Sequence, residues 1–176
     1  MSYAKLQTEI LLARDVREQV LSACQQTTEE SLVFVSTAIP GRNKTPYGTY
    51  SLFHWALAEI ERVFGSVRWQ SNLSHDLLGP YILFSTPRDP EETKQLCVEI
   101  EEAHPAARLM DLDVYSASVE RLGREDIGFP PRCCLLCDDL ATNCIRTHRH
   151  DSKTLNAHVT RLLNAFSDKT IGCNAG

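Results

Sequence analysis

The sequence predicts an α+β fold built around an antiparallel or mixed sheet, and three observations support this. From residue 31 onward, β-branched segments and helix-like segments follow the βαββαβ order of a ferredoxin-like core. A long helix-like segment precedes this core. The 176 residues, 43% of them hydrophobic, suffice to bury one core. We expect a single domain over residues 1–176, with the α+β core at 1–127 and a Cys/His-rich helical extension at 128–176.

The first three elements follow from the spacing of their apolar residues. Leu6 to Cys24 has apolar residues at helical intervals and charged residues largely on the other face, which predicts a long amphipathic helix. Ser31 to Ile39, SLVFVSTAI, is short, apolar and β-branched and ends at Pro40-Gly41, so we expect a strand followed by a turn. Tyr50 to Phe64 returns to helical spacing, and Gly65 marks its end.

The rest of the core is predicted to contain two strands, a helix and a last strand. Ser66 to Leu73 alternates weakly, whereas Tyr81 to Thr86 is a stronger strand. Asp89-Pro90 supplies a capping residue and a proline at the first helical position, and this helix should run to about Ala103. Arg108 to Ser116, RLMDLDVYS, alternates as a strand.

Composition argues against several classes of protein. With 18 basic and 23 acidic residues, the chain carries a net charge of −5 and is a poor candidate for non-specific nucleic-acid binding. Its N-terminal segment lacks the apolar core of a secretory signal, and no stretch is long enough to span a membrane, so we expect a cytoplasmic protein without membrane or nucleic-acid partners. The seven cysteines are an odd number, and four of them crowd together, which favours reduced thiols or a bound metal over disulfides.

Two aspartates in the last predicted core strand are candidate metal ligands. Residues two apart on a strand share one face with Cα atoms ~6.5 Å apart, so Asp111 and Asp113 can converge on one hard cation. Leu112 and Val114 would then face the core. A bound Mg²⁺ would relieve the repulsion between the carboxylates, and Mg²⁺ usually accompanies polyphosphate substrates. An exposed, solvated strand face is the alternative interpretation.

The segment from Arg132 to His150, RCCLLCDDLATNCIRTHRH, concentrates cysteine, histidine and arginine. One hypothesis is a structural zinc site, whose candidate ligands are Cys134, Cys137, Cys144 and His150 or His148. Alternatively, these cysteines pack as small buried residues. Cys133, next to an arginine, could instead act as a nucleophile with a lowered pKa. A final helix is predicted from about Ser152 to Phe166.

Basic residues near these motifs are candidates for phosphate binding. Arg14 and Arg17 lie about one turn apart on the first predicted helix, where a solvated face is the alternative. Lys44 lies in a turn after the first strand, where backbone N–H groups could cradle phosphates. Arg132 and Arg146 bracket the cysteines, and arginine can bind phosphate oxygens bidentately.

Taken together, these motifs resemble the apo-citrate lyase phosphoribosyl-dephospho-CoA transferase family. The resemblance spans roughly Leu6 to Leu155 and rests on four stretches: Leu12-Ala13-Arg14 to Arg17, Pro40-Gly41 to Lys44, Arg108 to Val114, and Pro131 to Cys137 followed by Ala141, Cys144, Arg146 and His150. The ordered occurrence of DLDV and CLLC with the later Cys, Arg and His is more specific than either motif alone. The chain departs from the usual family pattern at Ala107, Met110 and His148, and none of these changes removes a charge from the aspartate pair.

The resemblance implies a nucleotidyltransferase-type core and a Mg²⁺-dependent reaction. Enzymes of this family transfer the phosphoribosyl-dephospho-CoA group from triphosphoribosyl-dephospho-CoA to a serine of the acyl carrier (gamma) subunit of apo-citrate lyase and release pyrophosphate. On this basis Asp111 and Asp113 would hold Mg²⁺, and one of them or His150 would accept the serine proton. The expected phosphate-binding residues are Arg14, Arg17, Lys44, Arg108, Arg132 and Arg146.

Two other functions are compatible with the same residues. The Cys/His segment could be a zinc-stabilised knob in a non-enzymatic adaptor that binds proteins. The same transfer chemistry could also act on the carrier protein of another lyase or decarboxylase. Mg²⁺-dependent release of pyrophosphate separates the adaptor from the transferases, and the identity of the partner separates the two transferases.

Overall fold

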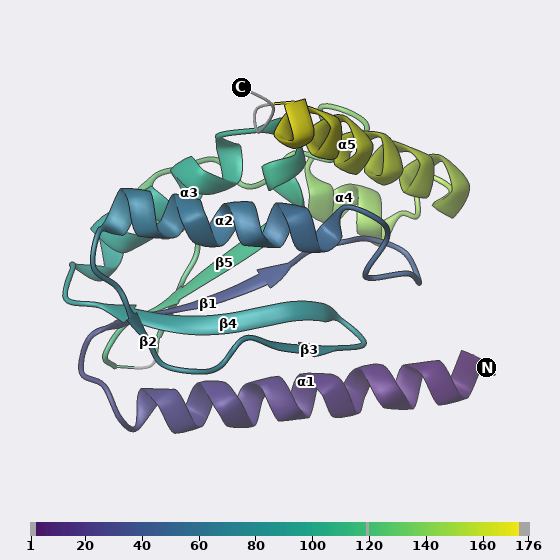
Figure 1. Cartoon of the computed structure of the whole chain (residues 1–176). Coiled ribbons are helices and arrows are strands. Elements are labelled where there is room, and N and C mark those ends of the chain that lie inside the picture. Colours follow the sequence, from purple (N-terminus) through teal and green to yellow (C-terminus); the bar gives the residue numbers. More distant parts are fainter. Residues whose placement is uncertain (1–2, 119, 173–176) are drawn as a thin grey trace.

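A computed structural model describes residues 3–118 and 120–172 of the chain as a layered α+β structure (Figure 1). Its α-helices are α1 (Tyr3–Gln25), α2 (Thr49–Phe64), α3 (Pro90–Glu102), α4 (Ala141–Arg146) and α5 (Ser152–Gly172). Its strands are β1 (Ser31–Thr37), β2 (Arg68–Trp69), β3 (Ser74–Asp76), β4 (Gly79–Thr86), β5 (Met110–Tyr115) and β6 (Arg121–Leu122). Two short 3-10 helices, η1 (Pro105–Leu109) and η2 (Glu125–Ile127), lie before β5 and after β6.

The strands form one antiparallel sheet in the order β2-β4-β1-β5-β6, and β3 pairs with the start of β4. The central strand β1 pairs Val35 with Ile82 of β4 on one side and with Leu112 of β5 on the other. Without the short strands β3 and β6, the spatial order is second, third, first and fourth strand, which is the ferredoxin-like arrangement of a βαββαβ unit. The predicted α+β class is confirmed.

Helices cover both faces of the sheet. Figure 1 shows α2, α3 and α5 on one face and the long helix α1 on the other. Alternation along β1 serves both layers, because Val33 and Val35 belong to the larger core under α2 and α3, whereas Leu32 and Phe34 belong to a smaller core under α1. Every residue of β1 is therefore buried, as expected for a strand covered on both sides.

The long elements match their predictions closely, and the short ones differ. The weak alternation over residues 66–73 yields only β2, and the edge strand β3 follows at residues 74–76. The start of the predicted strand at Arg108 is instead the end of η1, because Pro105 begins a helical turn whose cap is the His104 ring, which accepts the N–H of Ala106 at 3.0 Å. The two-residue strand β6 and the six-residue helix α4 were not predicted, since segments this short lack a periodic signal.

The C-terminal extension packs onto the core through α5. Val159, Leu163 and Phe166 of this helix belong to the larger core, and the Phe166 ring meets the edge of Trp55 of α2 at a centroid distance of 5.7 Å. This packing places the Cys/His segment and α4 beside the end of the sheet where β1 ends and β5 begins (Figure 1). Within the described residues, no helix combines the length and apolar content needed to cross a bilayer.

Candidate functional site

The two aspartates of β5 share the face of the sheet that α1 covers. Along this strand Met110, Leu112 and Val114 are buried in the larger core, while Asp111 and Asp113 alternate with them and are half-buried on the other side. Their antiparallel neighbours on β1 are Ser36 and Phe34 respectively. The prediction that both carboxylates lie on one strand face is confirmed.

Each carboxylate is held by one arginine through a single oxygen. Arg121 of β6 donates from Nε at 2.9 Å and from Nη2 at 2.6 Å to Oδ1 of Asp113. Arg132 donates from Nη2 to Oδ1 of Asp111 at 3.2 Å. The described hydrogen bonds of both aspartates end on Oδ1, which leaves Oδ2 of each available to a further cation.

The local electrostatics disfavour the charge on Asp111. Burial, followed by the repulsion of the neighbouring Asp113 carboxylate, raises the pKa of Asp111 to about 6, and the nearby Arg132 guanidinium opposes this rise only in part. Two carboxylates so arranged are the donor set for which a hard divalent cation would offset the repulsion.

A hollow of about 330 Å³, here named the α1 hollow, lies between α1 and the sheet and is lined by Arg14, Arg17, Ser36 and Asp113, among others. Arg14 is exposed, and its guanidinium makes no hydrogen bond or ion pair within the described part of the chain. Such a cation at the mouth of a hollow is free to bind an anion. The hollow thus joins one carboxylate of the pair to an available arginine.

Arg17 is engaged in the structure itself. It donates to both oxygens of Asp76, at 2.8 and 2.7 Å, and to the carbonyl oxygen of Gly79 at 2.8 Å. Its guanidinium also lies 4.6 Å from the centre of the Tyr81 ring. These contacts tie α1 to the β3-β4 hairpin, so Arg17 contributes positive charge to the hollow from a fixed position.

Lys44 lies close enough to Arg14 for the two charges to interact. Its ammonium donates to the carbonyl oxygen of Ile39 at 2.7 Å, and burial together with the positive charge of Arg14 lowers the pKa of Lys44. An anion bound between these two cations would offset their repulsion.

A buried carboxylate, Glu101 of α3, organises the edge of β5 next to Asp111. Its side chain is 1% exposed, and Oε1 accepts the backbone N–H of Leu112 at 2.8 Å. Arg132 lies 2.6 Å from the same oxygen, and Arg124 lies 2.7 Å from Oε2. Arg132, which also donates to the carbonyl of Met110 at 3.1 Å, is therefore a rigid bridge between Glu101 and Asp111.

Four side chains of the extension form a compact cluster. One ligand atom each from Cys134, Cys137, Cys144 and His150 lies within 4.8 Å of the others. The Cys137 sulfur is 3.5 Å from the Cys144 sulfur and 3.3 Å from Nε2 of His150. This set could hold a metal ion, and it contains the four residues predicted from spacing with His150, and not His148, as the histidine.

The thiols of this cluster differ in acidity. A hydrogen bond with the backbone of Asp139, followed by side-chain contacts with His150 and Cys144, lowers the pKa of Cys137 to about 6. Desolvation raises the pKa of Cys144 to about 12. The lowered pKa favours the thiolate at Cys137, which is the form that binds metals.

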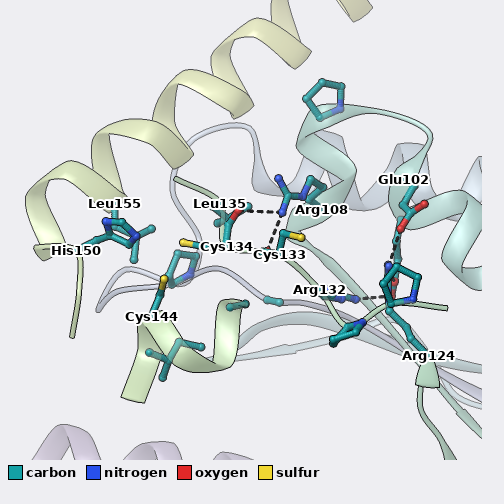
Figure 2. A pocket seen from close by; sticks show the side chains of 18 of the residues that line it. Glu102, Arg108, Arg124, Arg132, Cys133, Cys134, Leu135, Cys144, His150 and Leu155 are labelled. Atoms are coloured by element: carbon teal, nitrogen blue, oxygen red, sulfur yellow. Dashed lines mark hydrogen bonds and ion pairs between the residues drawn. The ribbon is translucent and has the colours of Figure 1, made fainter. Parts of the chain in front are cut away.

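A larger hollow, here named the C-terminal hollow, has a volume of about 910 Å³ and lies between the extension, the end of α3 and η1. Figure 2 shows Cys144, His150 and Leu155 at one end of it, Arg132, Arg124 and Glu102 at the other, and Arg108 between them. Three of the four cluster residues line this hollow, as does Cys133. Arg146, on α4, is exposed and lines neither hollow.

The side chains that hold the predicted site residues in place carry no clear local sequence signal. Arg121 lies on a two-residue strand that follows a loop, and Glu101 lies on a helix, 10 residues before Asp111. Neither position in the sequence indicates a contact with β5. An acidic residue at a position of the helical apolar stripe was the only available signal for Glu101. These contacts depend on tertiary packing.

Comparison with known proteins identifies related sequences over nearly the whole chain. Residues 6–166 match the model of a family described as apo-citrate lyase phosphoribosyl-dephospho-CoA transferase. A curated protein of that name from Escherichia coli strain IAI1 is 30% identical over 159 residues, which cover 89% of this chain and 87% of the relative. One from Shigella boydii serotype 18 has the same identity and coverage.

Proposed function

Because the chain belongs to the apo-citrate lyase phosphoribosyl-dephospho-CoA transferase family, we propose that it modifies the acyl carrier subunit of apo-citrate lyase. In this reaction a carrier serine oxygen attacks the α-phosphorus of triphosphoribosyl-dephospho-CoA. The new bond is a phosphodiester, the bond to the β-phosphate oxygen breaks, and pyrophosphate leaves while the serine proton passes to a base. The nucleophile belongs to the partner, so the enzyme needs a site for phosphates and metal and no serine of its own.

The observation that carries this proposal is the position of the aspartate pair beside available cations. Asp113 lines the α1 hollow together with Arg14 and Arg17, and Asp111 lies next to it on the same strand face. A carboxylate and an unpaired guanidinium group that line one hollow are suited to a metal-bound polyphosphate.

We assign Mg²⁺ to Asp111 and Asp113. The donor set fits, because each carboxylate keeps Oδ2 outside the described hydrogen bonds and because burial, followed by the charge of Asp113, raises the pKa of Asp111, a cost that a bound cation would offset. When bound, Mg²⁺ supplies a charge that orients phosphate oxygens and stabilises the pyrophosphate leaving group.

The cations of the site have different tasks. Arg14, which lines the α1 hollow and has no internal hydrogen bond in the described part of the chain, binds phosphate oxygens of the donor. Lys44 lines neither hollow and adds positive charge near Arg14. Arg17 and Arg132 are held by Asp76 and Glu101, so they contribute charge from fixed positions. Arg146 lies outside both hollows, and we do not include it in the donor site.

We further propose that the Cys/His cluster holds a structural Zn²⁺. With Zn–S bonds of about 2.3 Å, tetrahedral geometry requires sulfurs about 3.8 Å apart and a sulfur-to-nitrogen distance of roughly 3.5 Å. The distances of 3.5 Å between Cys137 and Cys144 and 3.3 Å between Cys137 and His150 are close to these values. His150 is then a ligand and is not the base for the serine proton. Four protein ligands close the site, which is typical of structural zinc.

The direct test is a transfer assay on defined components. The protein, the apo carrier subunit, triphosphoribosyl-dephospho-CoA and Mg²⁺ are incubated, and the intact mass of the carrier and the release of pyrophosphate are measured. We expect a mass increase that requires Mg²⁺ and that is lost in Asp111→Asn and Asp113→Asn. Glu99→Gln, which removes an exposed carboxylate of α3, should retain activity and serves as the matched control.

The same assay decides between the alternatives. Absence of transfer by the wild-type protein, together with one bound zinc per chain, would support the adaptor hypothesis. Transfer to another lyase or decarboxylase carrier in preference to the citrate lyase subunit would retain the chemistry and change the partner.

A further inference from the structure

The C-terminal hollow is separate from the aspartate pair and has a different character from the α1 hollow. Accepting the proposed function, we propose that it binds the dephospho-CoA part of the donor, with Arg108 on the diphosphate that links the adenosine to the pantetheine chain. The phosphate end of the donor then lies in the α1 hollow. Two adjoining subsites would therefore divide one long substrate.

Size supports this division. The α1 hollow, at about 330 Å³, lies at the lower end of the range of about 300–1,000 Å³ for small-molecule sites, and the C-terminal hollow, at about 910 Å³, lies near the upper end. A nucleotide joined to a pantetheine chain is too large for the smaller hollow once a triphosphate and a metal ion occupy it. Of the two hollows, only the C-terminal hollow has enough space for the rest of the donor.

The walls of the C-terminal hollow suit an organic ligand. Apolar surface comes from the loop before and within the Cys/His segment, from α4 and from the start of α5, through Pro130, Pro131, Leu135, Ile145 and Leu155. Ile145 is 72% exposed, although it is a large aliphatic residue, because it faces this open space. Apolar walls with a few polar groups are typical of sites for ligands with a flat ring and a flexible chain.

Arg108 is the cation of this hollow that is best placed to bind an anion. Its Nη2 donates to the carbonyl oxygens of Cys133 and Cys134, at 2.8 and 3.2 Å, and no carboxylate of the described residues pairs with it. By contrast, Arg124 and Arg132 are paired with Glu101. The two carbonyls fix the guanidinium in place and leave Nε and Nη1 for a ligand, and Figure 2 shows the Arg108 side chain in the middle of the hollow.

Arg132 and the aspartate pair link the two hollows. Arg132 lines the C-terminal hollow, and its Nη2 is 3.2 Å from Oδ1 of Asp111, whose neighbour on the strand face, Asp113, lines the α1 hollow. The loop after β1 extends from Pro40, which lines the C-terminal hollow, to Lys44, on which the charge of Arg14 acts. If Arg108 binds the diphosphate of the donor, the triphosphate end can thus extend alongside Arg132 to the aspartate pair.

The test uses dephospho-CoA, which lacks the triphosphoribosyl group, as the probe in calorimetric titrations of the full chain. We expect the wild-type protein to bind it and Arg108→Gln to bind it roughly tenfold to a hundredfold more weakly, the range of a lost charge-assisted hydrogen bond. Ile145→Glu, which places a negative charge in the hollow without removing an internal contact, should weaken binding as well. Arg62→Gln, an exposed arginine of α2, is the matched control.

Two comparisons separate this inference from the proposed function. Arg14→Gln should leave dephospho-CoA affinity unchanged and reduce transfer, whereas Arg108→Gln should raise KM for the full donor with little change in kcat. No binding of dephospho-CoA by the wild-type protein, unchanged affinity in both Arg108→Gln and Ile145→Glu, or an equal loss in Arg14→Gln would overturn the two-subsite arrangement, even if transfer occurs. Binding that depends on Arg108 in a protein without transferase activity would instead refute the function and support the subsite.

Discussion

Replacing Asp111 with asparagine should abolish transfer and at the same time stabilise the fold at neutral pH. Burial and the charge of Asp113 raise the pKa of Asp111 from 3.8 to about 6, so the folded protein holds this proton more tightly than the unfolded chain does. The protonated carboxyl stabilises the fold below pH 3.8, and this contribution is lost as the pH rises through about 6. Above that pH the wild-type protein carries the full cost of the charge, and an asparagine does not.

The size of the effect follows from the shift and from the exposure of the side chain. About two pKa units correspond to a ceiling of about 3 kcal/mol at roughly 1.4 kcal/mol per unit. The side chain is 34% exposed, so solvent screening reduces this ceiling, and asparagine also loses the ion pair with Arg132. We expect a net gain of about 1 kcal/mol, which is roughly 2–4 °C in Tm for a chain of this size.

The assay is urea unfolding at pH 7.5 and at pH 5 in Mg²⁺-free buffer, with Glu99→Gln as the control. The gain in the free energy of unfolding should be clear at pH 7.5 and smaller at pH 5, where much of the wild-type Asp111 is already protonated. Added Mg²⁺ should stabilise the wild-type protein and leave Asp111→Asn unchanged, because only the former retains the ligand pair. If Asp111→Asn is less stable than wild type at pH 7.5, or gains equally at both pH values, the reasoning from burial and repulsion is refuted.

Three further predictions concern the supports of the site. Cys137→Ser should lower zinc content from one per chain, as measured by metal analysis, and reduce Tm; an unchanged metal content would reject the assigned ligand set. Glu101→Gln should destabilise the fold by about 3–5 kcal/mol in urea unfolding, because it removes one partner of a buried charged network, whereas Glu102→Gln, at an exposed position, should have little effect. Leu163→Ala should cost about 2–5 kcal/mol while unfolding remains a single transition, because α5 shares the larger core with the sheet; a separate early transition for the extension would contradict this.

Local patterns predicted much of the fold. Helical periodicity over residues 6–24 and 50–64 and the capping residue Asp89 correspond to α1, α2 and α3, because these elements are long enough for their apolar spacing to be distinctive. Asp89 caps α3 as expected, since its side chain accepts the N–H of Glu91 at 2.8 Å. The short elements β3, β6 and α4 exist because of pairing or packing with distant segments, and no local pattern encodes that.

In the candidate site too, the features that depend on residues close together in the chain were predicted, and the features that depend on distant residues were not. The common face of Asp111 and Asp113 follows from the two-residue period of a strand, and the Cys/His cluster follows from spacing within one short segment. These predictions involve residues close together in the chain, for which the backbone geometry restricts the possible arrangements. The internal engagement of Arg17 with the β3-β4 hairpin, by contrast, joins residues 59 positions apart.

The sequence alone determined the type of sheet, the face of the acidic pair and the composition of the Cys/His cluster, because each depends on short-range periodicity or spacing. Tertiary structure decided which cations are available and where they lie. Packing of α1 on one face of the sheet brings Arg14 to Asp113, whereas packing of the extension at the end of the sheet brings Arg108 to the second hollow. A guanidinium becomes a ligand site or an internal ion pair according to the carboxylates that folding places beside it, and those partners lie far apart in the chain.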